Sequence, residues 1–243
     1  MSRLKIVTCL SFFLTTSTGF AEGLDDNKPS IHQLLNPSMP KAQMDKSIDT
    51  KKQSDLKQYY ESGNYFKDIQ KQLVEAKGYL DRQLQLQDKQ SNRLAVVLDI
   101  DETALSNYRA MERLSFTNNT SAISAIYIQA NADPILPVLE FYQYAINKGV
   151  AVFFISARPN SPEFVVATAQ NLKKAGFTMW EELILKPLDK DNLSTQDFKI
   201  ASRKDIAAKG FDVILNIGDQ TADLEGGYAQ ARVRIPNPFY ELA

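Results

Sequence analysis

Short apolar runs alternate with longer amphipathic stretches through the second half of the chain, and this alternation is the strongest constraint on its fold. Residues 94–98 form a continuous apolar run, as expected for a strand that is buried on both faces of a parallel sheet. Four more strands are predicted at residues 150–155, 183–185, 213–217 and 232–235. The pattern predicts an α/β fold with a doubly wound parallel sheet and helices on both faces.

The helices between these strands are predicted from apolar spacing and from end signals. Residues 136–147 have the spacing of an amphipathic helix. Ser161 and Pro162 suit the N-cap and the first position of the next helix. Ser194 and Asp197 resemble a capping box that opens a third helix. One predicted helix therefore lies between each two successive strands among the first four.

The first 21 residues have the three parts of a signal peptide. Arg3 and Lys5 are basic, residues 6–14 are mostly apolar, and small residues precede a predicted cleavage site after Ala21. The apolar part is too short for a permanent membrane anchor. We therefore expect a secreted or periplasmic protein that has no membrane partner after cleavage.

Two further segments precede the strands. Residues 22–50 are polar and contain three prolines, which favours an extended arm or linker. Residues 55–87 have apolar side chains at helical spacing that Gly63 interrupts, which predicts two helices. We expect these N-terminal helices to cover the sheet, with a homodimer interface as the alternative. Residues 51–243 are expected to form one domain.

Scarcity of cysteine and histidine limits the chemistry of the mature chain. The only cysteine, Cys9, is lost with the signal peptide, and the only histidine, His32, lies in the polar arm. A thiolate nucleophile and the usual Cys/His zinc sites are therefore excluded. Cleavage leaves 26 basic and 29 acidic residues, a net charge of −3, which gives no indication of a nucleic-acid partner. Carboxylates, hydroxyls, lysine and a hard cation remain as the means of catalysis.

Polar or small residues follow three of the predicted strands, namely Asp99 and Asp101 after the first, Ser156 and Ala157 after the second, and Asp219 and Asp223 after the fourth. Ligands of open parallel sheets bind outside the carboxyl ends of the strands. We expect these side chains to converge on one crevice. Taken alone, the two aspartates after the first strand could instead cap the next helix or face solvent. A hydroxyl such as that of Ser156 is common after a strand, and Gly218 with Asp219 has the composition of a turn.

This set of residues suits phosphoryl transfer. A carboxylate nucleophile is repelled by a phosphate group unless a cation lies between them, and Mg²⁺ prefers one or two carboxylates with water and substrate oxygen. Asp99 could attack phosphorus, with Asp99 and Asp219 as carboxylate ligands. Asp101 could protonate the leaving alcohol and then activate water. Ser156 and nearby backbone N–H groups could donate to the phosphate.

The order DxDxT, a strand ending in Ser, a Lys and GDxxxD resembles the haloacid dehalogenase (HAD) superfamily of phosphotransferases. The closer likeness is to the subfamily IIIB acid phosphatases, which include secreted bacterial phosphatases and plant vegetative storage proteins. It extends over residues 59–65, 97–107, 153–159 and 216–220, and roughly over residues 56–243. The resemblance implies a Rossmann-like, HAD-like fold.

The resemblance also implies roles for four aspartates. Asp99 would be the nucleophile and Asp101 the acid/base, and both would contact the magnesium ion, Asp101 through its backbone carbonyl. Asp219 would bind the ion directly and Asp223 through water. The expected cofactor is Mg²⁺, and the expected partners are small phosphate monoesters.

The family lysine would screen the repulsion between nucleophile and phosphate, and the sequence offers two candidates for it. Lys199 lies twenty positions before Asp219, which resembles the family arrangement, whereas Lys186 follows the third strand. We favour Lys199 as the catalytic and phosphate-binding lysine, together with Ser156 and Ala157. Lys186 remains the alternative.

Residues 108–133 are too many for a plain strand-to-helix loop and are expected to form a small cap beside the site. Tyr108, Phe116 and Tyr127 could stack on an aromatic leaving group or hold the cap together. The resulting hypothesis is a secreted acid phosphatase that hydrolyses phosphate monoesters through a Mg²⁺-assisted aspartyl-phosphate. The alternatives are a non-catalytic storage or binding protein of the same fold and an enzyme that transfers phosphate to alcohols.

Overall fold

The computed structural model describes residues 50–88, 92–116, 120–189 and 193–240. The predicted signal peptide at residues 1–21 and the predicted arm, apart from residue 50, lie outside the described residues. None of the helices among the described residues has an apolar stretch long enough to cross a membrane.

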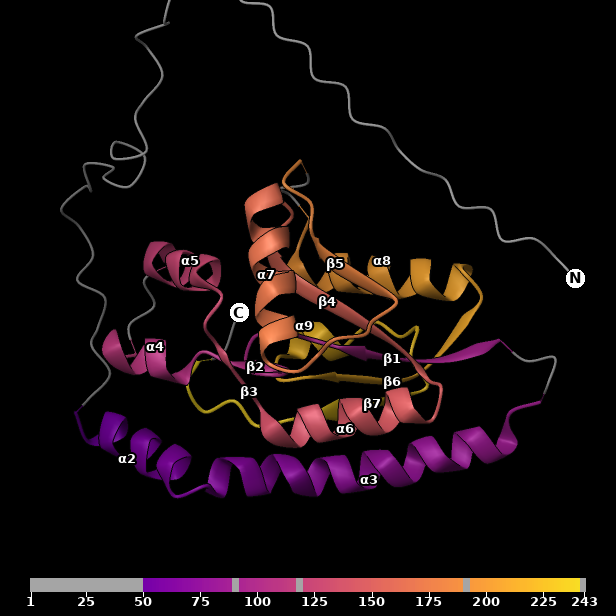
Figure 1. Ribbon diagram of the computed structural model, residues 1–243, viewed down its shortest axis with the longest axis horizontal. Helices are drawn as coiled ribbons and strands as arrows, with labels where there is room; N and C mark the ends of the chain where they lie inside the picture. Colours follow the sequence, from indigo (N-terminus) through magenta and orange to yellow (C-terminus); the bar gives the residue numbers. More distant parts are fainter. Residues whose placement is uncertain (1–49, 89–91, 117–119, 190–192, 241–243) are drawn as a thin grey trace, which may run out of the picture. The chain divides into compact units, whose positions relative to one another are not determined.

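A five-stranded sheet with strand order β5-β4-β1-β6-β7 forms the centre of the fold, and all its neighbouring strands are parallel (Figure 1). Its strands are β1 (Arg93–Leu98), β4 (Ala151–Pro159), β5 (Glu182–Lys186), β6 (Phe211–Gly218) and β7 (Ala231–Arg234). Each corresponds to one predicted apolar run. The predicted doubly wound α/β fold is confirmed.

Helices cover both faces of this sheet because successive side chains of a buried strand point to opposite sides. On one face, Val96 and Leu98 of β1 belong to the core that includes α3 (Asn64–Leu86) and α6 (Leu136–Asn147). On the other face, Val97 packs with Phe198 of α8 (Thr195–Ala208). Figure 1 shows α3 and α6 on one side of the strands and α8 on the other. The continuous apolar runs are explained by this double burial.

The predicted helix ends agree with the structure. Gly63 has a left-handed backbone (φ 77°) and separates α2 (Thr50–Glu61) from α3, a conformation that glycine adopts without steric cost. Ser161 accepts a hydrogen bond from the backbone N–H of Phe164 at the start of α7 (Pro162–Lys174). Ser194 does the same for Asp197 at the start of α8. These caps satisfy N–H groups that the helix itself leaves without a partner.

The segment between β1 and α6 contains α4 (Tyr108–Arg113) and α5 (Thr120–Gln129). It is bracketed by two short strands, β2 (Leu105–Ser106) and β3 (Asp133–Pro134), which pair in antiparallel fashion. These strands were not predicted from the sequence, because two residues are too few to show a periodicity. They bring the two ends of the insert together beside the carboxyl end of β1.

Candidate active site

The carboxyl ends of β1 and β6 lie side by side and carry the first predicted site residues. Asp99 follows β1 directly, and its backbone N–H donates to the carbonyl of Ile217 at 3.0 Å. Asp219 follows β6 directly. After β1 the chain forms β4 and β5 on one side of β1, and then β6 and β7 on its other side. The direction of winding therefore reverses between β1 and β6, and ligands of such sheets bind at this point.

Three carboxylates gather at this point. Asp99, Asp219 and Asp223 are buried, and each offers an oxygen that lies within 4.8 Å of the others. Asp223 belongs to the short helix α9 (Thr221–Leu224). A Cβ at Gly218 would collide with the Asp223 side chain, so glycine is required for this close approach.

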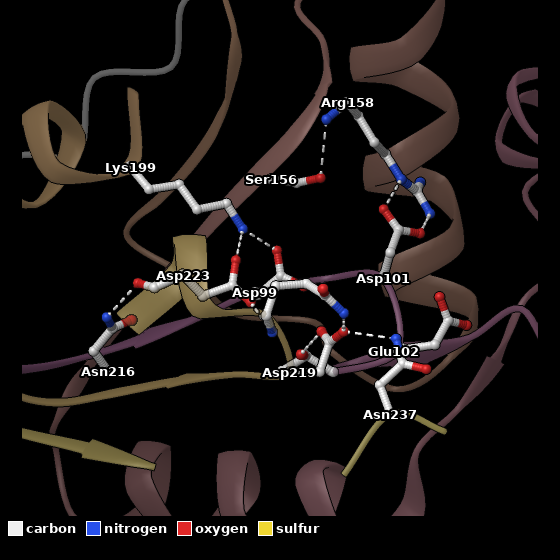
Figure 2. Close-up of polar contacts among 12 residues, drawn as sticks. Asp99, Asp101, Glu102, Ser156, Arg158, Lys199, Asn216, Asp219, Asp223 and Asn237 are labelled. Atoms are coloured by element: carbon white, nitrogen blue, oxygen red, sulfur yellow. Dashed lines mark hydrogen bonds and ion pairs between the residues drawn. The ribbon is translucent and has the colours of Figure 1, made fainter. Parts of the chain in front are cut away.

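Lys199 enters the carboxylate cluster from α8 (Figure 2). Its Nζ lies 2.5 Å from Asp99 Oδ1 and also contacts Asp223 Oδ1. Burial lowers the pKa of Lys199, but the charges of Asp99 and Asp223 outweigh burial and raise that pKa above its usual value. Lys199 therefore remains protonated and supplies one positive charge to the three carboxylates.

The pKa values of two of the carboxylates are raised as well. Burial, followed by the charge of Asp223, raises the pKa of Asp99 well above its usual range. The same two causes raise the pKa of Asp219 to about 6. When ionised, the three carboxylates outnumber the one positive charge of Lys199, and an additional cation would relieve the repulsion between them.

Neutral donors hold two of these carboxylates in place. Asp219 accepts hydrogen bonds from Thr103 Oγ1 at 2.8 Å, Gln220 Nε2 at 2.5 Å and Asn237 Nδ2 at 2.8 Å. Asp223 Oδ2 accepts from the backbone N–H of Gln220 at 2.8 Å. Each bond stabilises the charged form of a carboxylate, and together they fix the direction of its oxygens.

Asp101 lies on the same loop as Asp99 but has a different partner. Arg158 donates to both of its oxygens, from Nε at 2.9 Å and from Nη2 at 2.7 Å. Asn107 Nδ2 also donates to Asp101, at 2.8 Å. The Arg158 side chain is 1% exposed, and its guanidinium lies 4.1 Å from the centre of the Tyr127 ring on α5. Two bonds in this fork geometry fix the carboxylate as well as attracting it.

The remaining predicted residues lie at the ends of neighbouring strands. Ser156 is buried inside β4, three residues before its carboxyl end, and its Oγ accepts from the backbone N–H of Arg158 at 3.2 Å. Ala157 follows it and is half-buried. Lys186 ends β5 and is half-buried, and its backbone carbonyl accepts from the N–H of Asn160 at 2.7 Å. Among the described residues, Lys199 rather than Lys186 forms the contact with Asp99.

The three aromatic residues predicted in the insert differ in their surroundings. The Tyr108 ring stacks on Tyr60 with 3.7 Å between ring centres, and the Phe116 ring is stacked on Phe239. Both side chains are buried. This arrangement corresponds to the packing alternative for Tyr108 and Phe116, whereas Tyr127 lies beside Arg158.

Several residues at the site were missed by the sequence analysis. Glu102 is buried with a left-handed backbone (φ 55°) and accepts from the Asn107 N–H at 2.7 Å and from the Tyr240 hydroxyl at 2.5 Å. Burial, followed by the charge of Asp101, raises the pKa of Glu102 to about 8. Glu102 and Arg158 stand inside the quoted motifs, which was a usable signal. Asn237 and Tyr240 had none, because they lie far from the motifs in sequence.

Comparisons with known proteins agree with this geometry. The family model "HAD superfamily, subfamily IIIB (Acid phosphatase)" matches residues 16–243. The chain is 34% identical over 152 residues to the stem 28 kDa glycoprotein of Glycine max, a match that covers 60% of this chain and 59% of the relative. It is 31% identical over 150 residues to acid phosphatase 1 of Solanum lycopersicum, covering 60% and 58%. Vegetative storage protein 2 of Arabidopsis thaliana is 32% identical over 148 residues, covering 59% and 55%.

Solved structures show the same fold. The class C acid phosphatase from Bacillus anthracis has a TM-score of 0.62 and 21% sequence identity, and the match covers 78% of this chain and 87% of that chain. The curated relatives are matched over less than two thirds of their own length. The family model, in contrast, matches most of the chain. The resemblance found in the sequence is thereby confirmed, and the chain belongs to subfamily IIIB, the acid phosphatases, of the HAD superfamily.

Proposed function

We propose that this protein hydrolyses phosphate monoesters through an aspartyl-phosphate formed on Asp99. The observation that carries the proposal is the position of Asp99 at the carboxyl end of β1, in contact with Lys199 and beside Asp219 and Asp223. This arrangement joins a carboxylate nucleophile to the positive charge that a phosphate requires.

The carboxylate cluster also fits a divalent cation. Its donors are oxygens, which hard cations such as Mg²⁺ prefer. Its three carboxylates outnumber the one positive charge of Lys199. Asp99, Asp219 and Asp223 would hold the ion, with the backbone carbonyl of Asp101 as a further ligand. When bound, Mg²⁺ would neutralise negative charge on the phosphate.

The chain's own residues account for the two chemical steps. The first step begins with Asp101 protonated: an oxygen of Asp99 forms a bond to phosphorus, the ester P–O bond breaks, and Asp101 gives its proton to the leaving alcohol. In the second, Asp101 takes a proton from water as that water attacks phosphorus, which releases phosphate and restores Asp99. Lys199, Ser156 and the N–H groups near Ala157 stabilise the phosphate oxygens.

Export from the cytoplasm is part of the proposal. The basic, apolar and small-residue parts at residues 1–21 support a cleaved signal peptide, followed by an arm and by one catalytic domain over residues 51–243. The location would be secreted or periplasmic. A homodimer through α2 and α3 stays an open proposal.

A storage role is the second candidate, because relatives of this chain include proteins named vegetative storage proteins. The presence of both Asp99 and Asp101 favours catalysis. Turnover separates the two functions, since a storage protein of this fold releases no phosphate.

The proposal is tested by phosphate release from p-nitrophenyl phosphate by the mature protein, with Mg²⁺ and with EDTA. We expect Asp99→Asn to lower turnover on the order of 10⁴-fold, because the nucleophile is removed, and EDTA to abolish it. Asp205→Asn changes an exposed aspartate on α8 and should leave turnover unchanged. Turnover of Asp99→Asn at the wild-type rate would contradict the assignment, and an inactive wild type would favour the storage role.

A further inference from the structure

The chain after β7 returns to the carboxyl ends of the strands. The backbone N–H of Ile235 donates to the carbonyl of Gly218 at 3.0 Å, and the Ile235 side chain is fully buried. Residues 236–240, here named the C-terminal segment, follow directly. They therefore begin beside Asp219, on the same edge of the sheet as the proposed active site.

We propose that the C-terminal segment is a wall of the active site and positions two of its carboxylates. Asn237 would hold Asp219, and Tyr240 would hold Asp101 through Glu102 and Asn107. Both are positioning residues, since each acts through another side chain. The inference rests on the proposed function for the consequences in catalysis, but its first test below does not require turnover.

Three hydrogen bonds orient the Asn237 amide, and one of them is to Asp219 (Figure 2). Its Nδ2 donates to Asp219 Oδ2 at 2.8 Å. Its Oδ1 accepts from the backbone N–H groups of Phe239 at 2.9 Å and Tyr240 at 3.4 Å. The two bonds to Oδ1 orient the amide, so its Nδ2 points at the carboxylate. A donor placed behind a metal-ligating carboxylate fixes the direction of its oxygens and raises metal affinity.

Tyr240 reaches the other side of the site through a chain of hydrogen bonds. Its hydroxyl donates to Glu102 Oε2 at 2.5 Å, and Glu102 Oε1 accepts from the backbone N–H of Asn107 at 2.7 Å. Asn107 Nδ2 in turn donates to Asp101 Oδ1 at 2.8 Å. Glu102 adopts a left-handed backbone (φ 55°), which is uncommon for a residue other than glycine. The contacts of its carboxylate hold it there.

Burial of aromatic side chains anchors the segment. Phe239 is 5% exposed, and its ring centre lies 5.6 Å from those of Tyr65 and Tyr108 and 6.0 Å from that of Phe116. These partners come from α3 and from the insert between β1 and α6. Two prolines, Pro236 and Pro238, restrict the backbone on either side of Asn237. The segment is therefore held on several elements and can serve as a rigid support.

One segment would thus support two separable properties, namely affinity for the cation through Asp219 and proton transfer through Asp101. Substitutions at Asn237 and Tyr240 should produce different defects. A segment with a merely structural role would instead lower stability without changing either property selectively.

The first test is calorimetric titration of the full mature chain with Mg²⁺. We expect Asn237→Ala to weaken Mg²⁺ binding about 10-fold or more, as found when partners of metal-binding side chains are removed. Asn92→Ala removes a matched amide that donates to an aspartate, Asp212, at an exposed position, and should bind Mg²⁺ as the wild type does. Equal affinity of Asn237→Ala and wild type would overturn the role of Asn237. A wild type that binds no Mg²⁺ contradicts the proposed metal site and, with it, this role.

The second test compares two substrates, p-nitrophenyl phosphate and glycerol 2-phosphate, in saturating Mg²⁺. An alkyl alcohol leaves only with a proton, whereas p-nitrophenolate leaves well without one, so misplacing Asp101 should harm the alkyl ester more. We expect Tyr240→Phe to lower kcat/KM for glycerol phosphate about five-fold more than for p-nitrophenyl phosphate. Equal losses on both esters, or none, would overturn the role of Tyr240.

Tyr144→Phe is the matched control for this second test. It removes a tyrosine hydroxyl that donates to the carboxylate of Asp81 at 2.6 Å, on α6 and away from the site. We expect it to leave both kcat/KM values at the wild-type level. A wild type that hydrolyses neither ester contradicts the proposed function and, with it, the role of Tyr240, and the titration of Asn237→Ala then decides the role of Asn237.

Discussion

Asp99 and Asp101 lie two residues apart on one loop, yet their surroundings differ in charge balance. Asp99 shares a buried cluster with Asp219 and Asp223, where Lys199 supplies the contacting positive charge. Asp101 is paired one to one with Arg158 through two hydrogen bonds. The first environment carries an excess of negative charge, and the second is balanced.

This difference indicates how two aspartates of one loop can have different roles. Like charges held together in a buried place are stabilised by a further cation, which suits a metal site that binds phosphate. A balanced and geometrically fixed pair requires no ion and can keep one carboxylate apart from the metal. The charge balance therefore distinguishes the proposed nucleophile from the proposed acid/base, although both are aspartates of the same motif.

Replacing Lys199 should have the largest effect on this comparison. Lys199→Met leaves buried carboxylates without their contacting cation, so we expect the free energy of unfolding in EDTA to fall by about 3–5 kcal/mol. Turnover should fall on the order of 10³-fold, because the phosphate loses a charged donor. Urea unfolding with and without Mg²⁺ measures the first effect. The ion should raise the stability of the variant more than that of the wild type, and an equal gain would contradict the charge-excess argument.

Replacing Arg158 breaks the balanced side instead. Arg158→Met should lower stability by about 3 kcal/mol, because a charged partner of Asp101 is lost, and kcat by about 10-fold to 100-fold. The stability loss should be the same in Mg²⁺ and in EDTA, unlike that of Lys199→Met. Urea unfolding in both conditions checks this. Recovery of Arg158→Met by Mg²⁺ would show that the two environments are not separate.

Glu102 offers a pH-dependent test on the side of Asp101. Its pKa is raised from 4.5 to about 8, so the folded state binds this proton more tightly than the unfolded chain. The resulting stability is fully present below about pH 4.5 and is lost as pH rises through about 8. In EDTA, Glu102→Gln should reduce the fall in stability across this range by at most about 1.4 kcal/mol per pH unit. Chemical unfolding from pH 5 to 8 measures this, and an unchanged slope would contradict the raised pKa.

The sequence predicted those parts of the fold and site that have a local pattern. The five strands of the parallel sheet appear as short apolar runs, and Ser161 and Ser194 mark helix starts through hydrogen bonds to residues three positions away. Asp99 and Asp219 were found because each directly follows a buried strand. In every such case the physical cause lies within a few residues of the effect.

The rest of the site depends on contacts between distant parts of the chain. Tyr240 bonds to Glu102 across 138 positions, and Arg158 bonds to Asp101 across 57. No periodicity or cap connects such pairs, so the sequence showed the residues without their partnership. The strands β2 and β3 were missed for a related reason, since two-residue pairs depend on the fold that brings them together.

The choice between Lys186 and Lys199 shows the same limit and leads to the smallest expected effect. Both follow the motif order, but Lys199 is buried in contact with Asp99, whereas Lys186 is half-buried and uses its backbone carbonyl to bond the N–H of Asn160. Lys186→Ala keeps that carbonyl. We expect stability within about 0.5 kcal/mol of the wild type and turnover of p-nitrophenyl phosphate within about two-fold. Loss of turnover comparable to that of Lys199→Met would transfer the phosphate-binding role to Lys186, because a half-buried lysine can reach a substrate that is absent from the free protein.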